Sequence, residues 1–172
     1  MRVPLFFLLL LFAANSFALE IDKAYRLIPH QQTPFVLHQS NIPHDQAAKV
    51  AQLLSLAELA MVARVDAMLN GPVKNDYFSQ IDTILWQLQN LDTSQDLLQA
   101  KLHILSAIRQ HRSYFELHKA DDNKARTERN KLIQSSHRQL ITAYNTLMQL
   151  YPQETRHNKQ AFFDYLCALD FI

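Results

Sequence analysis

The chain is poor in the residues that make tight turns and covalent cross-links. Its 172 residues include one glycine, Gly71, and one cysteine, Cys167. Sheets joined by hairpins usually need several Gly or Asn-Gly turns, so the single glycine predicts an all-α fold. It also excludes a glycine-rich loop that cradles phosphates. The single cysteine excludes an intramolecular disulfide, and its apolar sequence neighbours indicate a small buried side chain.

Charge of either sign is not in surplus. The chain has 17 Lys and Arg against 16 Asp and Glu. Nucleic acid is therefore a poor partner, because phosphate binding needs a basic surplus or a clustered basic face. The sequence contains no G-x-S-x-G, H-E-x-x-H or EF-hand motif, which removes the most common hydrolase and metal-site signatures. No cofactor is predicted.

The first eighteen residues are predicted to be a removable export signal. Arg2 supplies a positive start, Val3 to Ala14 is almost unbroken Leu, Phe and Ala, and Ser16-Phe17-Ala18 places small residues where a signal peptidase reads. The apolar run is shorter than the roughly 20 residues that cross a bilayer. We therefore expect cleavage before Leu19 and no transmembrane segment afterwards. An exported domain without disulfides is typical of a periplasmic or secreted protein of a Gram-negative bacterium.

The mature chain divides into an arm and one helical domain. Residues 19–43 contain Pro29, Pro34 and Pro43 and are expected to form an extended arm. Residues 44–172 are predicted to form an antiparallel four-helix-type bundle, closed by a short fifth helix from about Thr155 to Phe171.

Turn and cap residues set the expected helix boundaries. The first helix should run from His44 to Asn70, where Asn70-Gly71-Pro72 stops it with a left-handed residue and a proline. A second helix should begin near Asn75 or Asp76, either of which can cap it. Its apolar stripe consists of Tyr77, Ile81, Ile84, Leu85 and Leu88.

Two further long helices follow. The third should run from about Gln95 to His118 after an Asp92-Thr93-Ser94 turn, and the fourth should end at Tyr151 before Pro152. The inward residues of the third are predicted to be Leu97, Leu98, Leu105, Ile108 and Phe115; those of the fourth are Ile133, Leu140, Tyr144, Leu147 and Tyr151. Asp122 and Arg126 are spaced for a weak ion pair at the start of the fourth helix.

Arg64 is the first candidate for chemistry. It lies on a helix that is apolar nearly all round, so its charge needs a carboxylate, carbonyl groups or an anionic ligand, unless the side chain reaches an edge. His137 lies within an apolar stripe and is expected to be a neutral core histidine, or an acid or base if it shares a pocket with Arg64. Glu58 is a weaker catalytic candidate, because a solvated polar face explains its position.

Eight histidines suggest a metal or haem site, but their spacing argues against one. No two stand three or four apart on a helix. His111 and His118 are seven apart, about 10 Å along a helix axis, and could share an ion only with groups from another helix. We therefore predict no metal site, and we keep this pair as an alternative.

Trp86 is predicted to point away from the apolar stripe of its helix. An outward tryptophan is either covered by another part of the chain or marks a contact surface for a partner. The segment Phe35-Val36-Leu37 of the arm is one candidate cover.

These features favour a non-enzymatic binding or protein-interaction role, as a periplasmic accessory protein or a secreted factor. Two alternatives remain. One is a small all-helical enzyme that acts on an anionic metabolite in a pocket between helices. The other is a histidine-based metal or haem binder.

Overall fold

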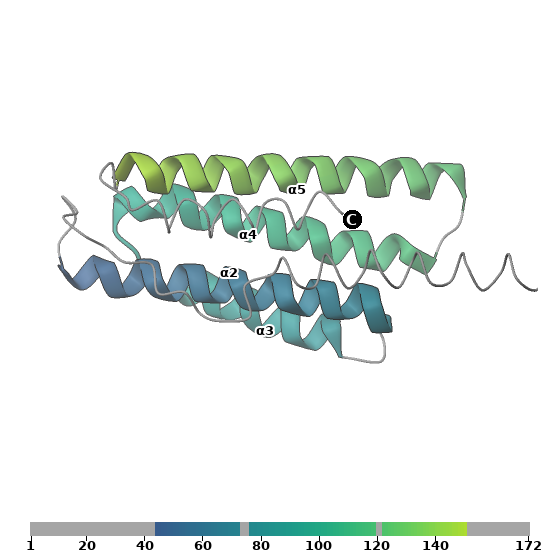
Figure 1. Ribbon diagram of the computed structural model, residues 1–172, viewed down its shortest axis with the longest axis horizontal. Coiled ribbons are helices and arrows are strands. Elements are labelled where there is room, and N and C mark those ends of the chain that lie inside the picture. The colour runs from purple at the N-terminus through teal and green to yellow at the C-terminus, as the bar shows by residue number, and fades with distance from the viewer. Residues whose placement is uncertain (1–43, 73–75, 120–121, 151–172) are drawn as a thin grey trace, which may run out of the picture.

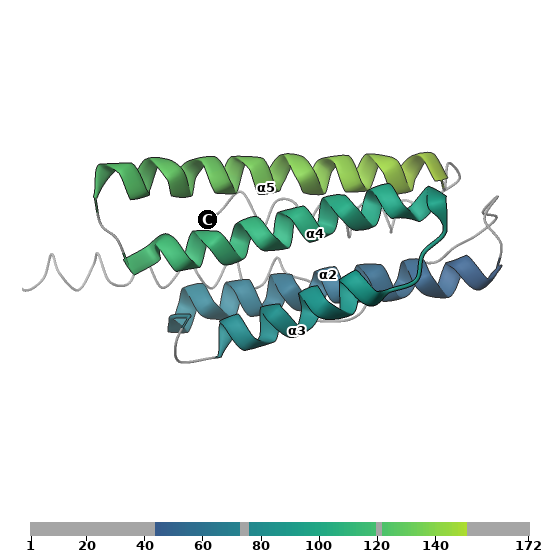
Figure 2. The same cartoon turned by 180° about the vertical axis from the view of Figure 1, so that it is seen from behind.

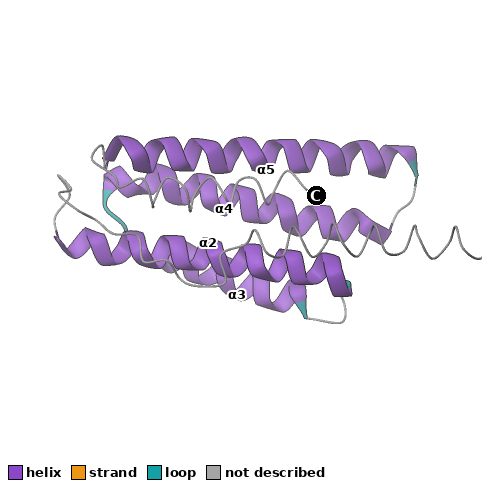
Figure 3. Ribbon diagram, viewed as in Figure 1, coloured by secondary structure: helices purple, strands orange, loops and turns teal. Residues whose placement is uncertain are grey.

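The described part of the chain is entirely helical in its regular structure. The computed structural model describes residues 44–72, 76–119 and 122–150. They form α2 (His44–Asn70), α3 (Tyr77–Asn90), α4 (Gln95–Glu116), the short 3-10 helix η1 (Leu117–Lys119) and α5 (Asn123–Leu150). Successive long helices run in opposite directions, with α2 and α3 as one pair and α4 and α5 as the other (Figures 1 and 2). No strand is drawn in these residues (Figure 3), so the all-α prediction is confirmed for them.

α2 ends where the glycine is. Gly71 follows the helix with a φ of 86°, in the left-handed region that side chains with a Cβ avoid. The predicted range His44–Asn70 is confirmed, because this stop signal is local to three consecutive residues. Val50, Leu53 and Ala60 are among the helix's fully or almost fully buried side chains.

The apolar stripe of α3 is confirmed, but Asp76 does not cap the helix, and the alternative cap, Asn75, lies outside the described residues. All five stripe residues are buried: Tyr77, Ile81, Ile84, Leu85 and Leu88. Asp76 occupies the N-cap position of α3, yet its φ is 51° and its side chain makes no capping hydrogen bond. A side chain caps from extended backbone geometry, which Asp76 does not have. Ser94 precedes α4 and also makes no side-chain cap.

α4 and α5 depart slightly from the predicted pattern. Leu98 is half-buried rather than part of the fully buried face of α4, and that helix tightens into η1 after Glu116. α5 already begins at Asn123, and Oδ1 of Asp122 accepts a hydrogen bond from the backbone N–H of Ala125 at 2.6 Å. The carboxylate predicted to pair with Arg126 therefore caps the helix instead.

α4 is the helix through which the two pairs meet. It packs against α2, α3 and α5, and its contact with α5 is the most extensive of any pair. The central core draws on all four long helices, with Leu53, Leu88, Leu97 and Leu147 each almost fully buried. Figure 1 shows α4 between α5 and the pair of α2 and α3. Any polar group on its buried face can therefore contact two other helices.

Polar side chains also tie the helices at their ends. Nζ of Lys101 donates to the carbonyl of Leu91 at 2.8 Å, just after the last turn of α3. Arg112 of α4 pairs with Asp82 of α3, and its guanidinium lies 5.5 Å from the ring centre of Phe78. The lysine side chain thus lies beside a carbonyl dipole, which is a common arrangement near a helix C-terminus.

Several predictions concern residues outside the described ranges. They are the export signal (1–18), the proline-containing arm (19–43), Tyr151, the fifth helix and Cys167. Among the helices that the structure describes, none is long and apolar enough to span a membrane.

Candidate functional site

Three polar side chains form a buried array that links α2, α4 and α5. Arg64 is 0% exposed, His111 2% and Ser136 1%. Nη1 of Arg64 donates to Nε2 of His111 at 2.8 Å, and Ser136 Oγ makes a short contact with the same nitrogen. His111 is therefore at the centre of the array, because it lies on α4, which packs against both α2 and α5.

The contacts determine the protonation of His111. A guanidinium can only donate, so Nε2 must accept, and the ring proton lies on Nδ1. Ser136 then donates its hydroxyl proton to the same lone pair. Burial lowers the pKa of His111 well below its usual 6.5, and the positive charge of Arg64 lowers it further. The ring is therefore neutral at pH 7.

Arg64 is only partly satisfied in its buried position. Burial lowers its pKa to about 10, so it still carries its charge at neutral pH. Its Nε and Nη2 atoms have no hydrogen-bond partner. In the described part of the chain, no carboxylate lies within salt-bridge distance of it. Arg64 thus has a neutral histidine as its polar partner, and its side chain does not extend to the surface of the bundle.

A fourth polar group shares this region. Tyr77 of α3 is 1% exposed, and its hydroxyl also has no hydrogen-bond partner. Its ring centre lies 4.5 Å from that of Phe115, one turn beyond His111 on α4. Burial raises the pKa of Tyr77, and Arg64 opposes that shift through its charge. The phenol therefore stays neutral.

A serine bonded to a histidine is also the arrangement of a nucleophile and its base, but the chemistry here is unfavourable. A base must take a proton, and Nε2 already accepts from a permanent cation, which opposes protonation of the ring. Both His111 and Ser136 are sealed from solvent. The array is thus suited to fixing three helices relative to one another, not to attacking a substrate.

The histidine beside Arg64 is not the one that the sequence suggested as its pocket partner. His137 is half-buried on α5, next to Ser136 in the chain, and Glu58 is half-buried on α2. Sequence reasoning missed the pairing of His111 with Arg64, although a signal was present. Ile104, Ile108, His111 and Phe115 follow one another at spacings of four, three and four, which places His111 on the buried stripe of α4.

The alternative histidine pair is not brought together around an ion. His118 is exposed, and its ring centre lies 6.3 Å from that of Tyr114. His111 Nε2 is occupied by Arg64 and Ser136. The described ranges contain no group of three or more His, Cys, Asp or Glu side chains placed to hold a metal ion.

Trp86 projects from α3 into solvent. It is 64% exposed, the largest exposed fraction among the large hydrophobic side chains of the described residues. The next residue, Gln87, and Asp82 one turn earlier are also exposed, whereas Leu85 and Leu88 lie on the buried side. The prediction that Trp86 points away from the apolar stripe is therefore confirmed. The arm segment considered as its cover lies outside the described residues.

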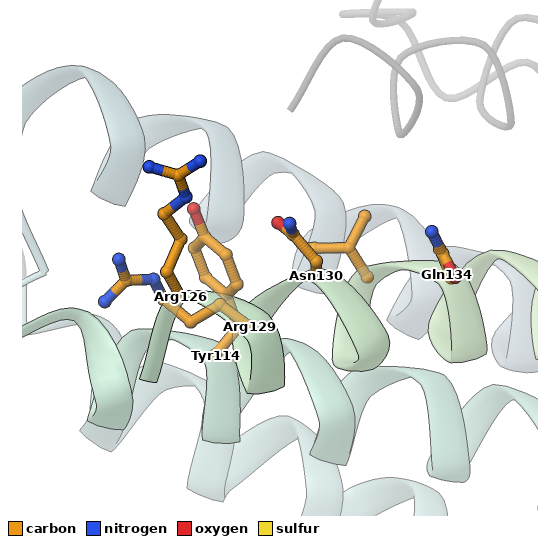
Figure 4. Close-up of a pocket in the computed structure, with 6 residues that line it drawn as sticks. Tyr114, Arg126, Arg129, Asn130 and Gln134 are labelled. Carbon is orange, nitrogen blue, oxygen red and sulfur yellow. The ribbon is translucent and has the colours of Figure 1, made fainter. Parts of the chain in front are cut away.

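A separate pocket opens between α4 and α5 near the start of α5. Its volume is about 360 Å³, and it is lined by Tyr114, Arg126, Arg129, Asn130, Ile133 and Gln134. Figure 4 shows the two arginines and the tyrosine at one end, and Asn130 and Gln134 toward the other. This pocket was not predicted, because Tyr114 lies on α4 and the other lining residues lie on α5, which runs in the opposite direction.

No protein family, no curated protein and no solved structure matches this chain. Its function is therefore inferred from its own residues.

Proposed function

We propose that this protein is exported and acts without catalysis, by binding a protein partner through the face of α3 that carries Trp86. The observation that carries the proposal is the exposure of Trp86, at 64%. Tryptophan is enriched among residues that dominate binding energy at protein interfaces, because one side chain buries a large rigid area. Leaving it in water costs hydrophobic free energy that a partner would recover.

The position of Trp86 on its helix supports a binding role over a folding role. α3 buries Tyr77, Ile81, Ile84, Leu85 and Leu88 on its other side. Truncation of Trp86 therefore removes no core contact of that stripe, and the helix should keep its place. Asp82 and Gln87 nearby would form the polar rim that surrounds such an anchor.

The buried array gives indirect support for a role without catalysis. Its histidine is neutral, sealed and already engaged by Arg64 and Ser136. Export is supported by the sequence of residues 1–18, and the periplasm or the exterior of a Gram-negative bacterium is the proposed destination.

Site-directed cross-linking tests the proposal. A photoreactive amino acid at position 87, next to Trp86, should capture one defined protein in the producing cell, identified by mass spectrometry. The affinity of that purified protein for the chain is then measured by calorimetry. We expect Trp86→Ala to weaken binding by at least about tenfold, because interface anchors contribute about 2 kcal/mol or more.

The matched control is Leu59→Ala. Leu59 is another exposed apolar side chain, at 48%, and it lies on α2 instead of α3. This variant should bind within about twofold of the wild type, and circular dichroism should show that both variants fold. Equal loss in both variants, or no loss in Trp86→Ala, would show that the interface is not centred on Trp86.

A further inference from the structure

The pocket between α4 and α5 is lined by hydrogen-bond donors around two positive charges. Arg126 and Arg129 stand three residues apart on α5, so they lie on neighbouring positions of one helix face. The amides of Asn130 and Gln134 and the hydroxyl of Tyr114 add further donors. No Asp or Glu is among the lining residues.

Three acidic residues near the pocket in the described part of the chain make contacts elsewhere. Asp122 caps the first turn of α5 through Ala125. Glu128 pairs with Lys131 at 3.5 Å, and Glu116 pairs with Arg112 on α4. Within the described ranges, these interactions leave the guanidinium of Arg126 without a carboxylate partner.

Arg129 is held in place by the turn before α5. Its Nη1 atom donates to the carbonyl oxygen of Leu117 at 2.9 Å, in the segment that joins α4 to α5. A guanidinium has five N–H donors in a fixed plane, so this bond fixes the orientation of the group. Arg126 is exposed and can move toward a ligand, whereas Arg129 is half-buried and positioned in advance.

The buried Arg64 adds to the positive potential behind the pocket. Tyr114, which lines the pocket, lies close enough to Arg64 to influence its pKa. Arg64 is bonded to a neutral histidine and is fully buried, so its field is weakly screened by solvent ions.

We propose that this pocket binds a small organic anion. A carboxylate or phosphate group would be held by Arg126 and Arg129, and an apolar part would lie against Ile133 and the ring of Tyr114. Guanidinium groups bind both kinds of acid through paired hydrogen bonds. A volume of about 360 Å³ is within the range of small-molecule sites. The site goes beyond the proposed protein contact, since it lies on α4 and α5 and does not involve Trp86.

The test uses three probes on the purified chain: benzoate, its neutral counterpart benzamide, and inorganic phosphate. Binding is measured by calorimetry, and the site is located by NMR through the side-chain amides of Asn130 and Gln134. We expect benzoate to bind and to shift these amides, whereas benzamide does not. If phosphate also binds at the same amides, the acidic group alone is sufficient for binding. If benzoate binds and phosphate does not, the ligand is a carboxylate with an apolar part.

Two matched arginine variants decide whether the pocket itself is responsible. Arg126→Gln should weaken benzoate binding by at least about tenfold, because it removes a charged donor from the site. Arg138→Gln removes an exposed arginine from the same helix outside the pocket, and it should change affinity by less than about twofold. Equal effects in the two variants, equal binding of benzamide, or binding of neither anion would overturn the proposal.

Discussion

Replacing Arg64 with methionine should make the protein more stable. The guanidinium is fully buried, makes one hydrogen bond to a neutral histidine, and leaves Nε and Nη2 without partners. Each unsatisfied buried donor costs about 1–3 kcal/mol, and transfer of the charge out of water costs several kcal/mol more. The bond to His111 recovers about 1.5–3 kcal/mol, which is less than these costs.

Methionine keeps most of the apolar stem of Arg64 and removes its charge. Nε2 of His111 would still accept a hydrogen bond from Ser136, so the substitution leaves no buried acceptor without a donor. Exchange of buried ionic groups for apolar ones of similar volume is often neutral or stabilising by about 1–4 kcal/mol, and we expect Arg64→Met in that range. For a chain of this length, each kcal/mol corresponds to a rise of about 2–4 °C in the melting temperature.

Urea unfolding followed by circular dichroism at 222 nm measures the effect. Arg64→Lys is the control, because it retains a buried positive charge and should therefore be less stable than Arg64→Met. A loss of more than about 1 kcal/mol in Arg64→Met, with an unchanged denaturant slope, would refute the reasoning and show that the contacts of Arg64 outweigh its desolvation. A stabilised variant with unchanged partner binding would contradict the prediction that Arg64 binds a ligand.

Two further predictions concern His111 and the N-terminus. The pKa of His111 is lowered on folding, so the unfolded chain binds a proton first as pH falls, and the stabilisation is complete above pH 6.5 and declines below it. Between pH 7.5 and 5, protonation of the unfolded chain at His111 should lower the unfolding free energy of the wild type by about 2 kcal/mol. The His111→Gln variant should not show this loss. Equal losses of unfolding free energy for the two proteins in urea titrations would count against a neutral buried histidine. Sequencing of the protein recovered from the periplasm or medium should begin at Leu19, and a sequence starting at Met1 would contradict a removable signal.

Helix boundaries and buried stripes were predictable where neighbouring residues decide them. Asn70-Gly71-Pro72 ends α2 because Gly71 adopts a positive φ that its own lack of a Cβ permits. The five-residue stripe of α3 follows from helical periodicity alone. Asp76 shows where local reasoning fails: its residue type favours a cap, but its left-handed backbone prevents the side chain from forming one.

The candidate sites were predictable only in part. The sequence identified Arg64 as a cation on an apolar helix and Trp86 as an outward side chain, because both statements depend on positions along one helix. The pocket with Arg126 and Arg129 was not foreseen, since it requires Tyr114 of α4 to lie beside the first turns of α5.

Three features follow from the amino-acid sequence alone: the helical class of the described residues, the end of α2 at Gly71, and the need of Arg64 for a polar partner. The packing of the helices determines that this partner is His111, 47 residues away, and that Ser136 of α5 completes the array. Periodicity states which face of each helix is buried, but it does not state the register at which two buried faces meet. That register brings His111 to Arg64, and it leaves His137 half-buried on α5.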